Sequence, residues 1–234
     1  MSSIAEAGAQ ALRLIVGAEP HLVGIVLLSL KISLTSVTMA CLVGLPAGAA
    51  VAVSEFPGKR SVIVVLNALM GLPPVVVGLF VYLMLSRAGP LGAWGILFTP
   101  TAMVIAQTIL IAPLMAALSR QAVADAWSEY REQLRSLGET KLGAAATLLW
   151  DLRFSLVTLI MAGFGRAAAE VGAVIIVGGN IDGVTRVMTT TIALETSKGD
   201  LPLALGLGFI LLAIVLALNA GAYLIKETAQ RHYG

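Results

Sequence analysis

Residues 201–225 read LPLALGLGFILLAIVLALNAGAYLI, a run of 25 residues without a charged side chain. A helix needs about 20 apolar residues to cross the hydrocarbon core of a membrane, so this run predicts a transmembrane helix. The rest of the chain agrees, because 58% of its 234 residues are apolar, 12% are charged, and the mean hydropathy is +0.94. Soluble domains are about one quarter charged and could not bury this much apolar surface. The composition predicts a multi-pass membrane protein and argues against a soluble enzyme or a disordered chain.

Four further stretches are long enough to cross a membrane, which predicts an all-α protein with about five transmembrane helices. They are residues 32–54, 61–86, 95–119 and 156–177. The first is expected to begin near Leu22, which places Lys31 within the helix or near its outer end. Pro73-Pro74 and Pro113 are expected to kink or interrupt their helices, either as packed kinks or beside a substrate site.

The stretch at residues 156–177 differs from the others because it contains Arg166 and Glu170. Exposure of either charge to lipid would be costly, so both are expected to be paired or to face protein or water. Their spacing of four residues predicts that both side chains lie on one face of a continuous helix.

Few chemical signatures accompany the apolar stretches. The net charge of +2 argues against nucleic acid as a partner, and a single cysteine, Cys41, excludes an internal disulfide and a Cys-rich metal site. Glu6 and Arg13 argue against a cleaved signal peptide, and residues 1–20 are expected to lie along the outer membrane interface. The sequence contains no nucleotide-binding loop, zinc-protease motif or serine-hydrolase elbow. No catalytic residue, cofactor or metal is predicted, and uphill transport would need a partner or an ion gradient.

Residues 120–154 form a charged stretch between the apolar ones, with 10 of the 28 charged residues of the chain (15 basic and 13 acidic). Alanine and leucine recur there at steps of three and four, which predicts two short amphipathic helices with Gly138 near the turn between them. A solvated loop of this length without secondary structure would be uncommon. An amphipathic hairpin outside the membrane is better explained as a docking surface.

The distribution of lysine and arginine predicts the orientation, because cytoplasmic loops of membrane proteins are enriched in both. With residues 120–154 in the cytoplasm, nine basic residues lie inside and four lie outside, leaving out Lys31 and Arg166 within the spans. The N-terminus is then expected outside and the C-terminus in the cytoplasm.

Part of the hairpin resembles a known motif. Glu132-Gln133-Leu134-Arg135-Ser136-Leu137-Gly138 is similar to the EAA loop of permease subunits in bacterial ABC importers, in which a Glu stands six residues before a fixed Gly. In this chain Gln133 and Leu134 replace the two alanines that follow the Glu, and residues 148–151 lack the usual proline.

Other stretches resemble the molybdate and tungstate branch of these permeases, over roughly residues 22–225. Residues 44–60 are similar to the end of the first core helix and the first cytoplasmic loop. Residues 164–173, FGRAAAEVGA, look like the helix after the EAA loop. Residues 178–190, with GGNI and TRVMTT, and residues 89–101, with GPLG and LFTPT, are most similar to the tungstate branch.

The resemblance implies a tungstate permease with the type I ABC importer permease (MetI-like) fold, as a single transmembrane domain over residues 1–234. Two copies would form a homodimer in the cell inner membrane, with two ATP-binding cassette ATPase subunits inside and a tungstate-binding protein outside. ATP hydrolysis is then expected in the partner subunit. The alternatives are a permease for molybdate or sulfate, since the binding protein usually determines specificity, and an ion-gradient-driven anion transporter or channel.

The resemblance also implies roles for particular residues. Five residues are expected to couple the chain to its ATPase: Glu132, Leu134, Arg135, Leu137 and Gly138. Four are candidates for the translocation path: Arg166, Glu170, Asn180 and Arg186. Two interpretations of Arg166 and Glu170 stay open. They are a structural pair whose charges neutralise each other, or they guide the oxyanion or form part of the gate. Two interpretations of Asn180 and Arg186 also stay open. They contact the binding protein or line the mouth of the path, or they belong to an ordinary polar loop.

Overall fold

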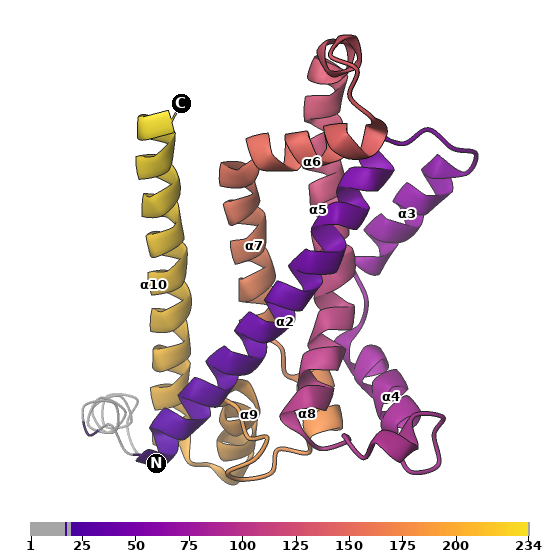
Figure 1. Cartoon of the computed structure of the whole chain (residues 1–234). Coiled ribbons are helices and arrows are strands. Elements are labelled where there is room, and N and C mark those ends of the chain that lie inside the picture. Colours follow the sequence, from indigo (N-terminus) through magenta and orange to yellow (C-terminus); the bar gives the residue numbers. More distant parts are fainter. Residues whose placement is uncertain (1–16, 18–19, 234) are drawn as a thin grey trace. The chain divides into compact units, whose positions relative to one another are not determined.

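The computed structural model describes residue 17 and residues 20–233, with side chains described up to residue 228. Every regular element in this described part is helical, which confirms the all-α class. The elements, labelled as in Figure 1, are α2 (Pro20–Val53), α3 (Lys59–Leu69), α4 (Pro74–Leu85), η1 (Gly92–Trp94), α5 (Pro100–Ser136), α6 (Lys141–Asp151), α7 (Arg153–Ala168), α8 (Gly172–Gly178), α9 (Met188–Lys198) and α10 (Leu201–Tyr233). The interfacial segment predicted for residues 1–20 falls almost entirely outside the described residues.

Three helices, α2, α5 and α10, are each long and apolar enough to cross a membrane. Two further pairs of helices pass the same test only together, α3 with α4 at an angle of 97° and α6 with α7 at 78°. The described residues therefore give three spans, or up to five if each bent pair is one span. The predicted five match the upper limit of this count.

The chain bends at one of the two predicted proline positions. Pro73 is extended, with φ −67° and ψ 119°, and Pro74 is the first residue of α4. Proline suits a first helical position because its missing N–H would have no partner there, so this break is confirmed. Pro113, in contrast, lies inside α5, and the helix continues through it. A proline within a transmembrane helix is tolerated where neighbouring groups satisfy the freed carbonyl.

The prediction of one continuous helix over residues 156–177 is wrong. α7 ends at Ala168 and α8 begins only at Gly172, so Glu170 lies in the break between them. The Glu170 carboxylate accepts a hydrogen bond from the N–H of Ala173 at 3.0 Å. A carboxylate at this position satisfies one of the unpaired donors at the start of a helix, which favours a new helix over continuation of α7.

The third span also differs from its predicted bounds. α5 begins at Pro100, five residues later than expected, and runs without interruption to Ser136. The first arm of the predicted amphipathic hairpin is therefore the end of a long helix, and only the second arm, α6, is a separate short helix.

The chain divides into two compact units. Of the described residues, the first unit contains 20–35, 73–107 and 165–218, and the second contains 36–72, 108–164 and 219–233.

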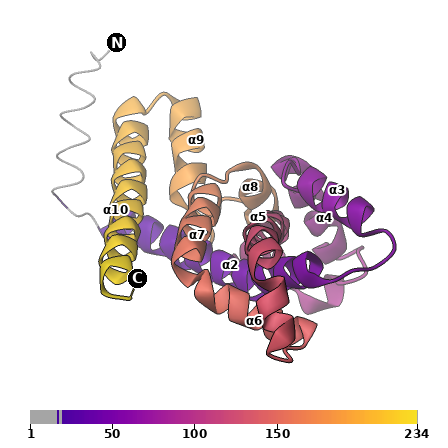
Figure 2. The same ribbon diagram turned by 90° about the horizontal axis from the view of Figure 1, so that it is seen from above.

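In the first unit, α4 and α8 lie side by side (Figures 1 and 2). Gly78 allows this approach, because a Cβ at position 78 would stand 2.7 Å from the Cα of Ala173. The Ser29 hydroxyl accepts a hydrogen bond from the N–H of Met188 at 2.8 Å, which links α2 to α9. A buried cluster completes the contact among α2, α9 and α10, with Leu22, Ile25, Met188 and Leu207.

In the second unit, α2 and α5 approach each other backbone to backbone. A Cβ at Gly44 would stand 2.7 Å from a carbonyl oxygen of α5, and a Cβ at Gly48 would overlap the carbonyl oxygen of Ala116. The Ser119 hydroxyl donates to the carbonyl of Leu45 at 2.9 Å. Two glycines four residues apart are a common means of close helix packing in membranes. Here they fix α2 against α5 where the hairpin begins.

Candidate functional site

The hairpin between α5 and α6 turns at Gly138, as predicted. Gly138 has φ +76°, a left-handed conformation that glycine adopts without strain. Its N–H donates to the carbonyl of Arg135 at 3.0 Å, and the N–H of Glu139 donates to that of Leu134 at 3.1 Å. This Schellman motif satisfies the last carbonyls of α5. The Thr140 hydroxyl then caps the first turn of α6, so local hydrogen bonds define the turn on both sides.

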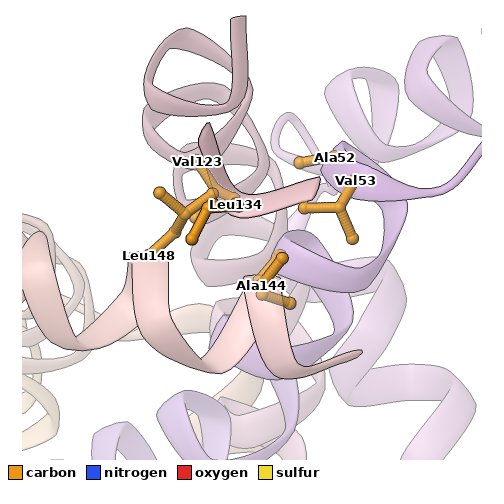
Figure 3. Close-up of a cluster of buried hydrophobic side chains, with 8 residues drawn as sticks. Ala52, Val53, Val123, Leu134, Ala144 and Leu148 are labelled. Carbon is orange, nitrogen blue, oxygen red and sulfur yellow. The ribbon is translucent and has the colours of Figure 1, made fainter. Parts of the chain in front are cut away.

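A buried apolar cluster holds the two arms of the hairpin together against the end of α2 (Figure 3). Its members are Ala49, Ala52 and Val53 of α2, Val123 and Leu134 of α5, and Ala144, Ala145 and Leu148 of α6. Leu134 is only 8% exposed. It was expected to anchor the chain to a partner, but the structure places it inside the hairpin's own core. Its contribution is therefore to the packing of the hairpin.

The outer surface of the turn, which we call the hairpin tip, is formed by Glu132, Arg135, Leu137, Gly138 and Leu142. Leu137 and Leu142 are 72% and 75% exposed. The Arg135 guanidinium lies 5.9 Å from the ring centroid of Trp127, within the range of a cation–π contact that restrains the arginine on the helix surface. Exposed apolar side chains with charged neighbours are typical of a protein docking surface.

Glu170 is buried at the break between α7 and α8, in the first unit. Besides its carboxylate contact with Ala173, its carbonyl accepts a hydrogen bond from the Thr189 hydroxyl at 2.8 Å. Arg166 lies in the last turn of α7, and its side chain is exposed. Within the described part of the chain the two residues form no ion pair. The predicted shared helix face is wrong, because α7 ends before Glu170.

A cavity of about 10 Å³ lies beside Glu170. It offers room for roughly one water molecule and is too small for a tetrahedral oxyanion. The Gln107 side chain lines it and donates from Nε2 to the carbonyl of Ala167 at 3.2 Å. Its Oε1 is buried and finds no donor among the described residues. Polar groups therefore meet at the break, but in this conformation the cavity between them is too small to admit an oxyanion.

Asn180 follows α8 in the loop that leads to α9, and it adopts φ +50°. Asparagine tolerates this left-handed conformation better than most residues. The fully buried Thr185 closes the loop on itself, since its hydroxyl accepts from the N–H of Ile181 at 2.9 Å and donates to the carbonyl of Gly178. The loop is thus an ordered element, and Asn180 is part of its backbone turn.

Arg186 lies in the same loop and belongs to a three-residue polar cluster. Its Nη1 is 3.1 Å from Oδ1 of Asp182, and Nε2 of His21 is 2.8 Å from the same oxygen. The hydrogen bond with His21, aided by the charge of Arg186, lowers the pKa of the Asp182 carboxyl. Arg186 is therefore partly neutralised by a neighbour, which weakens its attraction for an anion.

Several residues of these sites were not found from the sequence. They are His21, Gln107 and Asp182. Asp182-Gly183 was visible as a turn signal. The remaining contacts join residues 60 or more positions apart, or depend on the loop conformation, so no local pattern indicated them.

The apolar helices define the class of protein, a multi-pass membrane protein with three to five candidate spans among the described residues. No group of three or more His, Cys, Asp or Glu is placed to hold a metal ion in the described part of the chain.

Comparison with known proteins gives the particular family. The chain is 42% identical over 227 residues to the tungstate uptake system permease protein TupB of Peptoclostridium acidaminophilum, covering 97% of this chain and 100% of that protein. It is 42% identical over 218 residues to a probable anion ABC transporter permease protein of Haloferax volcanii, covering 91% and 94%. It is 36% identical over 174 residues to the TupB protein of Campylobacter jejuni, covering 74% and 73%. No known protein-family model matches the chain.

The chain belongs to the tungstate uptake permease family of ABC transporter permeases. It accordingly has the MetI-like permease fold. It is a non-enzymatic, multi-pass subunit of the cell inner membrane.

Proposed function

We propose that the chain is the permease subunit of an ABC importer that moves tungstate into the cell. The supporting observation is the 42% identity to a tungstate uptake permease over 97% of the chain. Molybdate or sulfate is the alternative substrate, because all three are tetrahedral dianions and the binding protein usually determines which is delivered.

In this function the chain acts as a single permease domain and forms a homodimer. Two ATP-binding cassette ATPase subunits bind in the cytoplasm and hydrolyse ATP, and a tungstate-binding protein delivers the substrate from outside. The N-terminus lies outside and the C-terminus inside. The excess of lysine and arginine on the proposed cytoplasmic side supports this orientation.

The hairpin tip is the proposed contact with the ATPase. Leu137 and Leu142 enter an apolar groove, Glu132 and Arg135 make polar contacts at its rim, and Gly138 permits the turn. The well-packed hairpin core favours movement as a rigid body when the two ATPases close. Because α5 is continuous from Pro100 to Ser136, a displacement of the tip reaches the apolar part of the same helix.

The proposed translocation path uses the polar groups outside the hairpin. Arg166, an exposed cation at the end of α7, attracts the oxyanion. Glu170 holds the break at which α8 begins, so an opening there would change the space available to substrate. Asn180 and the partly neutralised Arg186 face the binding protein or the mouth of the path.

The decisive experiment measures uptake of labelled tungstate in cells that express this chain with its ATPase and binding protein. Uptake should require both partners and should stop when the ATPase is made unable to hydrolyse ATP. Competition with molybdate and sulfate then ranks the three substrates. Uptake that continues without a functional ATPase and responds to the ion gradient would instead indicate a secondary transporter or channel.

Orientation is tested separately with single cysteines in a variant that lacks Cys41. Cysteines at Gly58 and Ser136 should react only with reagents applied from the cytoplasm, and a cysteine at Gly183 only from outside. Labelling of position 136 from outside would contradict the proposed ATPase contact.

A further inference from the structure

A groove between α7 and the end of α10, in the second unit, takes no part in the functions proposed above. Its volume is about 280 Å³. The lining residues lie on one face of each helix: Val157, Thr158 and Met161 of α7, and Asn219, Ala222, Tyr223 and Lys226 of α10. They include one cation and no carboxylate.

The polar end of the groove is suited to an anion. Lys226 Nζ donates to the Thr158 hydroxyl at 3.2 Å, which positions the ammonium beside the groove. An ammonium can donate three hydrogen bonds, so this contact leaves capacity for an anionic oxygen. Glu227 follows directly in the sequence, but neighbouring residues on a helix point in different directions and do not face the same groove.

The rest of the groove is mainly apolar. Val157, Met161 and Ala222 line it together with Asn219, and α10 exposes Leu224 and Ile225 within the same unit. Tyr223 is 64% exposed next to Lys226, and such amphipathic aromatic residues are enriched where the membrane meets water. A ligand for this groove therefore has an anionic head and a long apolar tail.

We infer that the groove binds an anionic phospholipid, with the phosphate at Lys226 and Thr158 and an acyl chain along Met161 and Ala222. Its volume suits the phosphate and glycerol region of a lipid, with the chains continuing along the helix surface. In the proposed orientation, which this inference shares, the groove opens to the cytoplasmic leaflet, where anionic lipids attract basic residues.

The test is native mass spectrometry of the purified full-length permease with added phosphatidylglycerol or phosphatidylcholine. We expect a retained phosphatidylglycerol molecule and weaker retention of phosphatidylcholine. Lys226→Gln should reduce phosphatidylglycerol retention about fivefold, as expected for the loss of one basic residue at a lipid surface. Ala222→Phe should reduce it by filling the apolar part of the groove while leaving the charge in place.

Arg87→Gln is the matched control, since it removes an exposed cation distant in sequence from both helices of the groove. Equal retention of both lipids, or undiminished phosphatidylglycerol preference in Lys226→Gln, would overturn the inference. So would a change from dimer to monomer in Lys226→Gln, because the groove would then belong to a contact between two copies. Lipid retention is measured without ATPase or tungstate, so its failure is distinct from failure of the proposed transport.

Discussion

Replacing Leu134 and Leu137 separately with alanine should have different consequences, although the two lie three residues apart. Leu134 is 8% exposed in the hairpin core, and Leu137 is 72% exposed at the hairpin tip. Truncating a buried leucine costs about 2–5 kcal/mol of folding free energy, because contacts are lost and a cavity remains. Truncating an exposed leucine usually changes stability by no more than about 0.5 kcal/mol. Only Leu134→Ala should therefore destabilise the permease.

For Leu137→Ala, the loss should appear in the association with the ATPase. Full burial of a leucine side chain is worth about 1.5–3 kcal/mol. Since 72% of Leu137 is exposed before binding, its insertion into a groove would contribute about 1–2 kcal/mol per hairpin. The variant should bind the ATPase about five- to thirtyfold more weakly.

Two measurements separate these effects, thermal unfolding of the purified permease and titration with the ATPase subunit. Ile181→Ala serves as the control, because Ile181 is 43% exposed in the loop after α8 and should affect neither quantity. If Leu137→Ala binds the ATPase with unchanged affinity, the leucine is not part of the contact. An equal fall in unfolding temperature for Leu134→Ala and Leu137→Ala would refute the assignment of one to the core and the other to the surface.

Three further predictions concern the turn, the helix break and the outer loop. Gly138→Val should uncouple ATP hydrolysis from uptake, measured side by side, because a β-branched residue is strained at φ +76°. Glu170→Ala should lower stability by about 1 kcal/mol through loss of the bond at the start of α8, whereas Glu170→Gln keeps an acceptor and should unfold near the wild-type temperature. The lowered pKa of Asp182 means that its ionised form favours the folded loop. This contribution is complete above the ordinary value of 3.8 and is lost as the pH falls through the lowered pKa. The difference in unfolding temperature between the wild type and Asp182→Asn should therefore persist above pH 3.8 and shrink only as the pH falls below that value, and a difference that has already vanished at pH 5 would contradict this.

The sequence was sufficient for features that depend on local composition. The long charge-free runs predicted α2, α5 and α10, because the length of a span follows from membrane thickness alone. Gly138 was predicted as the turn because it is one of only two glycines in the helical pattern of residues 120–154. Pro73-Pro74 was predicted as a break because proline cannot continue a helix.

Features that depend on distant contacts were not predictable in this way. The break at Glu170 forms where Thr189, 19 residues later, and the start of α8 satisfy its polar groups. Leu134 and Leu137 belong to the same apolar pattern, and the positions of α2 and α6 determine that Leu134 is the one covered. The charged residues Arg166 and Glu170 suggested a pair because a continuous helix was assumed.

The backbone contact at Gly48 limits how this sequence can vary. A side chain at position 48 would meet the carbonyl of Ala116, which belongs to the helix backbone and cannot rotate away as a side chain could. A saturation library should therefore accept almost no replacement there, including alanine. It should accept many apolar replacements at Leu42 and Val43, which are 64% and 63% exposed on the same helix. We therefore expect one face of α2, which contains Gly48, to accept almost no substitution, and the exposed face with Leu42 and Val43 to accept many.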